Sequence, residues 1–143
     1  MEREAVRVLG LDVGERRIGV ALSDPTGTIA SPLAALQRGS LEADLRAVVR
    51  LVGEHGAEAI VVGIPLSLSG RVGPQARLVR QFLQALSREL TVPVHAQDER
   101  FSTVEAERLL RESGQEPSRN RGLTDSASAA VILQSYLESQ RHP

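Results

Sequence analysis

Acidic residues stand at three points of this sequence where chemistry is expected. Asp12 ends an apolar segment that is typical of a strand, and Gly14 follows it. A charge at such a point is costly unless something pairs with it. Asp98 and Glu99 follow the last apolar strand-like segment, and Asp125 opens the last helix-like segment. In open α/β sheets, ligands bind where strands end and loops converge, so acids at these points can meet in space.

Clustered carboxylates are suited to holding hard cations. Mg²⁺ and Mn²⁺ take oxygen ligands, usually a few carboxylates together with water and substrate phosphate. Two such ions, about 4 Å apart, activate a water molecule and stabilise the leaving oxygen of a phosphodiester. This chemistry needs no thiol, and the sequence has no cysteine. The three histidines show no ligand spacing, and only His95, on the strand that leads to Asp98, is a candidate to support the acids.

Each acid also has a purely structural interpretation. Asp12 could form a local turn bond. Asp98 and Glu99 could pair with the arginine that follows them, and Asp125 could stabilise a helix N-terminus. The joint pattern is more specific than any single acid, and it favours a shared metal site. No fourth acid stands out, the remaining candidates being Asp24 and Glu105.

The pattern of apolar residues predicts the elements that must position these acids. Strands are expected at 6–11, 18–22, 28–36, 59–64 and 92–96, the third being edge-like at Pro32. Helices are expected at 41–54, from Pro74 onward, at 102–113, and from Asp125 to about residue 138 behind a Thr124 cap, with a polar loop over 115–122. This order predicts an α/β fold with a mixed five-stranded sheet, in which the first three strands are antiparallel and helices cover both faces.

Composition limits the class of protein and its partners. The 143 residues predict one domain over 1–143, and no apolar run or leader suggests a membrane or an export signal, so a cytoplasmic location is expected. The net charge is −1, and all 17 basic residues are arginine, so nucleic-acid binding would depend on local arginine clusters. The candidate phosphate contacts are Arg16, Arg17, Arg71, Arg77, Arg80, Arg100, Arg119 and Arg121.

Four segments resemble the YqgF/RuvX family: LGLDVGERRIGVA at 9–21, VGIP at 62–65, DERFST at 98–103 and DSASA at 125–129. The resemblance spans nearly the whole chain, in order. It implies an RNase H-like fold and a nuclease that processes the 5′ end of precursor 16S rRNA. It also implies that Asp12, Glu99 and Asp125 are catalytic acids that bind Mg²⁺ or Mn²⁺, with Asp98 as the alternative second ligand.

Other functions stay open at the level of sequence. The same family was earlier proposed to resolve Holliday junctions, so branched DNA is an alternative substrate to RNA. A non-catalytic ribosome-assembly factor that binds ribosomal particles is a second alternative, and an ATPase-like phosphate binder is a third. Nothing in the sequence decides between a monomer and a homodimer.

Overall fold

The computed structural model describes residues 6–66, 71–98, 108, 112 and 121–141. Its strands are β1 (Val8–Val13), β2 (Arg17–Ser23), β3 (Ala30–Gln37), β4 (Ala59–Ile64) and β5 (Val94–Asp98). Its helices are α1 (Leu41–His55), α2 (Pro74–Glu89) and α4 (Arg121–Arg141). The strands form one sheet in the order β3-β2-β1-β4-β5. As predicted, β1 to β3 pair in antiparallel fashion, whereas β4 and β5 add in parallel.

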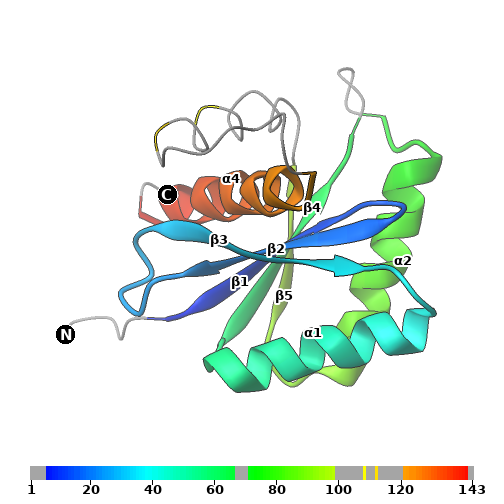
Figure 1. Cartoon of the computed structure of the whole chain (residues 1–143), viewed down its shortest axis with the longest axis horizontal. Coiled ribbons are helices and arrows are strands. Elements are labelled where there is room, and N and C mark those ends of the chain that lie inside the picture. Colours follow the sequence, from blue (N-terminus) through cyan, green and yellow to red (C-terminus); the bar gives the residue numbers. More distant parts are fainter. Residues whose placement is uncertain (1–5, 67–70, 99–107, 109–111, 113–120, 142–143) are drawn as a thin grey trace.

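Helices cover both faces of this sheet (Figure 1). On one face, α1 and α2 enclose the larger core, in which Leu9, Leu11, Ile60 and Val62 of the two central strands meet Val48 and Phe82. On the other face, α4 packs across β1, β2 and β3. Part of this contact is made by small side chains, since Ala129 and Ala130 of the helix pack in one cluster with Ala21 and Ala59 of the sheet.

Local signals account for the bounds of α1. The Ser40 hydroxyl accepts a hydrogen bond from the Ala43 amide at 3.1 Å, which satisfies one of the free N–H groups of the first turn. Gly56 ends the helix in the left-handed conformation (φ 63°), which costs glycine little. The predicted bounds, 41–54, are confirmed to within one residue.

The edge strand β3 contains the irregularity that its proline predicts. Val20 pairs with Ala34 and Ala21 pairs with Pro32, so the register shifts by one residue at this point. A proline has no amide hydrogen to donate, so it is tolerated at a sheet edge or a bulge. Pro32 lies on an edge strand and next to the register shift.

Three sequence predictions are wrong in detail. The first strand runs from Val8 to Val13 rather than over 6–11, so it includes Asp12. The last helix does not begin at a Thr124 cap, because α4 already includes Arg121, and the expected polar loop therefore ends earlier than residue 122. The last strand runs from Val94 to Asp98 rather than over 92–96, because its register with β4 pairs Val94 with Ile60 and Asp98 with Ile64. The helix expected at 102–113 lies mostly outside the described residues, and Arg108 and Glu112, which are described, are helical.

Candidate metal centre

The carboxyl ends of β1, β4 and β5 lie at one edge of the sheet, because these three strands are parallel to one another. Asp12 is the next-to-last residue of β1, and its register partner on β2 is Gly19. Gly10, two residues earlier, faces α4, since a Cβ built on it would stand 2.8 Å from Cβ of Leu133. Side chains two apart on a strand share a face, so Asp12 lies on the α4 side of the sheet.

The absence of a side chain at Gly19 brings Asp125 to this face. A Cβ on Gly19 would stand 2.5 Å from the carbonyl carbon of Asp125, a distance that real Cβ atoms essentially never show, and 3.1 Å from the Ser126 amide nitrogen. The backbone of α4 at Asp125 therefore rests directly on β2, next to the strand that carries Asp12. Asp125 therefore lies on the same side of the sheet as Asp12, over the neighbouring strand, and the shared metal site stays a prediction.

The Asp125 carboxylate has a cationic partner. The Arg17 Nε donates a hydrogen bond to Asp125 Oδ2 at 2.6 Å, and the two side chains are 24% and 34% exposed. The sequence interpretation had Arg17 as a phosphate contact and missed this pair. The available signal was Gly19, two residues further along β2, whose missing side chain lets a helix approach.

Asp98 lies on the opposite face from Asp12. Its register partner is Ile64, which belongs to the core under α1 and α2. His95, three residues earlier, lies on the α4 side, where its ring stacks on Tyr136 with 5.4 Å between centroids. The strand alternation therefore directs Asp98 away from the face that Asp12 and Asp125 share.

Several predicted site residues lie outside the described part of the chain: Glu99, Arg100, Glu105 and Arg119. Among the residues that are described, no group of three or more acidic, histidine or cysteine side chains is placed to hold a metal ion. Asp24, the other candidate acid, follows the far end of β2. Its carboxylate accepts hydrogen bonds from the Thr28 and Ile29 amides at 2.8 and 2.9 Å, so it closes its own turn.

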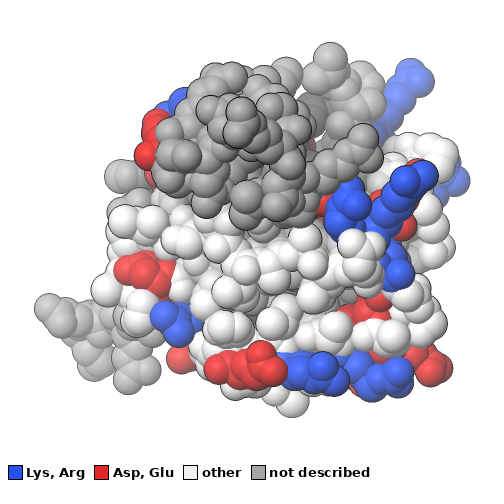
Figure 2. Space-filling view, viewed as in Figure 1, with Lys and Arg blue, Asp and Glu red and all other residues white. Residues whose placement is uncertain are grey.

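The predicted arginines that the structure describes lie on several different elements. Arg16 is exposed in the turn between β1 and β2, and Arg77 and Arg80 are exposed on α2, beyond the opposite face of the sheet from α4. Figure 2 shows basic side chains gathered where the β1–β2 turn and α2 overlap in this view, whereas along α1 basic and acidic side chains lie side by side. Arg71 is exposed just before α2, and Arg121 belongs to the first turn of α4.

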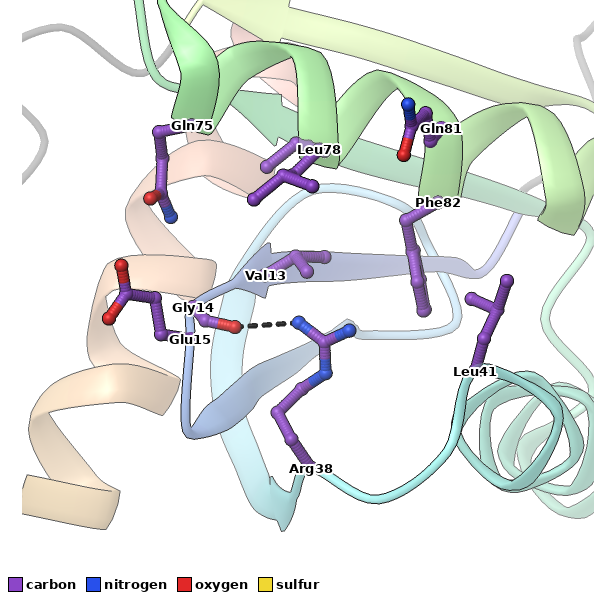
Figure 3. A pocket seen from close by; sticks show the side chains of 10 residues that line it. Val13, Gly14, Glu15, Arg38, Leu41, Gln75, Leu78, Gln81 and Phe82 are labelled. Atoms are coloured by element: carbon purple, nitrogen blue, oxygen red, sulfur yellow. Dashed lines mark hydrogen bonds between the residues drawn. The ribbon is translucent and has the colours of Figure 1, made fainter.

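A pocket of about 230 Å³ lies next to the β1–β2 turn, against α2 (Figure 3). It is lined by Val13, Gly14, Arg38 and Phe82, among others. Val13 follows Asp12 and is buried in the α1/α2 core. This pocket therefore lies on the opposite side of β1 from Asp12 and Asp125. Arg38 donates to the Gly14 carbonyl at 2.7 Å and lies 5.7 Å from the Phe82 ring centroid, so it secures the turn that follows Asp12.

Comparison with solved structures defines the class of fold. Thermus thermophilus RuvC in complex with a Holliday junction substrate matches with a TM-score of 0.65 and 14% identity, over 94% of this chain and 96% of that one. The fowlpox virus Holliday junction resolvase matches with a TM-score of 0.59, also at 14% identity, over 94% and 99%. The fold is thus the RNase H-like fold of RuvC-type proteins, as predicted.

Sequence comparison defines the family. The model of the family described as RuvX, Holliday junction resolvase, matches residues 6–139. A protein of Roseiflexus sp. named "Putative pre-16S rRNA nuclease" is 44% identical over 99% of this chain and 100% of its own length. A protein of the same name from Moorella thermoacetica is 47% identical over 93% and 95%. The chain belongs to the RuvX family, and the resemblance found in its motifs is confirmed.

Proposed function

We propose that this protein is a divalent-metal-dependent nuclease that processes the 5′ end of precursor 16S rRNA. The observation that carries the proposal is the placement of Asp12 and Asp125 on one face, at the edge where three parallel strands end. The names of relatives that match over nearly the whole chain support the substrate. The place of action would be the cytoplasm, where rRNA is processed in bacteria such as those of the relatives. Separately, none of the helices that the structure describes could span a membrane.

The donor set fits Mg²⁺ or Mn²⁺ better than a softer metal. Asp12 and Asp125 offer carboxylate oxygens, and the sequence has no thiolate to offer. We assign Asp12, Glu99 and Asp125 as the metal-binding acids, and we prefer Glu99 to Asp98 because Asp98 lies on the opposite face. When bound, a pair of such ions supplies an activated water and stabilises the leaving oxygen.

The remaining parts of the chain hold the acids and the substrate. Gly19 lets α4 approach β2, so that Asp125 reaches the edge beside Asp12. Arg38 fixes the turn after Asp12 through the Gly14 carbonyl. Exposed arginines near the edge, such as Arg16, would contact backbone phosphates, which positions a nucleic acid without reading its sequence.

The test is cleavage of a precursor 16S rRNA fragment beside a four-way DNA junction, each with Mg²⁺ or Mn²⁺. We expect the wild type to cut the RNA at its 5′ extension. Asp12→Asn and excess chelator should each abolish cleavage. Glu58→Gln, an isosteric change of an exposed acid just before the amino end of β4, should leave cleavage intact.

Three results would contradict parts of this assignment. Activity that survives chelator or Asp12→Asn would exclude a metal-dependent mechanism at this site. Preferential cutting of the junction would favour the alternative that the family description carries, a Holliday junction resolvase. Failure to cut either substrate, combined with complementation of a deletion strain by Asp12→Asn, would favour a non-catalytic assembly factor.

A further inference from the structure

The ion pair between Arg17 and Asp125 places a fixed cation on one of the proposed metal ligands. The Arg17 Nε lies 2.6 Å from Asp125 Oδ2, and both side chains are partly buried. A divalent ion bound to Asp125 would share that carboxylate with the guanidinium. Like charges a few ångströms apart at a protein surface repel one another, so the guanidinium would disfavour a divalent ion at Asp125.

The backbone holds this pair in place. Arg17 and Gly19 are two apart on β2 and share a face, and Gly19 is the residue on which the Asp125 backbone rests. The register partner of Gly19 on β1 is Asp12. The guanidinium therefore stands on the same face of the sheet as both acids, and the contact follows from how α4 docks.

We propose that Arg17 is a built-in counter-ion of the metal centre. It neutralises Asp125 when no metal is bound, and it competes with the divalent ion for that carboxylate. An arginine suits this role because its planar guanidinium forms short charge-assisted bonds with carboxylates. The proposal rests on the proposed function, since it takes Asp125 to be a metal ligand, and it makes Arg17 a positioning residue.

Metal affinity without substrate tests the proposal. In calorimetric titration of the full chain with Mn²⁺, Arg17→Gln should bind about tenfold more tightly than the wild type. Arg17→Lys, which keeps the charge, should stay close to the wild type. Arg46→Gln removes one charge from the exposed surface of α1, on the other side of the sheet, and should leave the affinity unchanged.

Thermal unfolding supplies a second readout. Without metal, Arg17→Gln should melt below the wild type, because Asp125 loses its partner, and Mn²⁺ should raise its melting temperature by more than it raises that of the wild type. If Arg17→Gln does not fold, Arg17→Thr is a second neutral variant that is suited to a strand, and it should bind Mn²⁺ with the same gain.

The outcomes separate this proposal from the function on which it rests. Unchanged or weaker Mn²⁺ binding by the neutral variants, with normal binding by the wild type, overturns the counter-ion role and leaves the metal site standing. Absence of Mn²⁺ binding by the wild type overturns the metal site, and the counter-ion role with it.

Discussion

The backbone of Asp125 rests directly on Gly19, with no room between them for even one methyl group. This contact seats the last helix against the second strand, and it sets where the Asp125 carboxylate stands relative to Asp12. Because Gly19 has only a hydrogen atom as its side chain, α4 can approach β2 closely enough to place Asp125 at the candidate centre.

Gly19→Ala should therefore lower both stability and activity. The added Cβ meets backbone rather than a flexible side chain, so the helix must move, and we expect a loss of about 3 kcal/mol in the free energy of unfolding. Urea denaturation measures it. Gly53→Ala is the matched control, because Gly53 lies in α1 with nothing within 4 Å of the new Cβ. It should raise stability by about 0.5 kcal/mol, and an equal loss in both variants would contradict the close contact.

Asp44 should contribute more to stability than the other acid in the first turn of α1. Its side chain is only 4% exposed, and it accepts hydrogen bonds from Arg38 Nε at 2.8 Å and from the Gly39 amide at 2.9 Å. Asp44→Ala leaves these donors unpaired and should cost about 2–3 kcal/mol in urea denaturation. Glu42→Ala, in the same turn but exposed, should cost less than about 1 kcal/mol. Similar losses of unfolding free energy in the two variants would show that the buried Arg38–Asp44 pair contributes no more than an exposed acid.

The Asp24 turn should make stability depend on acid pH. Hydrogen bonds from the Ile29 amide, the Thr26 hydroxyl and the Thr28 amide lower the pKa of Asp24 from its ordinary value of 3.8 to about 2. Because the folded-state pKa is the lower one, the stabilisation is complete above about pH 4 and is lost as the pH falls through about 2. The gap in urea midpoint between the wild type and Asp24→Asn should therefore narrow between pH 4 and pH 2. A gap that stays constant over this range would contradict the assignment.

The two neighbouring acids Asp98 and Glu99 should differ in their effect on cleavage. Asp98 pairs in register with Ile64, on the face away from Asp12, so Asp98→Asn should retain most of the activity. Glu99→Gln removes the proposed ligand and should reduce cleavage by about 100-fold or more. Initial rates at saturating Mn²⁺ compare the two isosteric variants directly, and the reverse order would move the ligand to Asp98.

Local signals explain which parts of the fold could be predicted from sequence. Ser40 and Gly56 set the ends of α1 through bonds within a few residues. Apolar runs mark the central strands β1 and β4. The bounds of β5 depend instead on its register with β4, which the sequence of β5 does not contain. The start of α4 was misplaced because Thr124 resembles a cap, although the helix already runs through it.

The candidate site divides in the same way. The close approach of the last helix to the strands beside Asp12 was predictable, because the helix is rich in small residues. The Arg17–Asp125 pair was not, because it depends on which residue of β2 the helix meets, and that is set by the space above Gly19. The role of an arginine near an acid is ambiguous until that contact is known.

The separation of Arg17 and Asp125 by 108 positions has a consequence for biosynthesis. The first strands emerge from the ribosome long before α4 does, and contacts between distant segments form late in folding. The acidic centre can be complete only after the C-terminal helix has been made and has docked. A nascent chain on the ribosome would therefore hold Asp12 and Arg17 without Asp125, and the proposed metal site could form only at the end of synthesis.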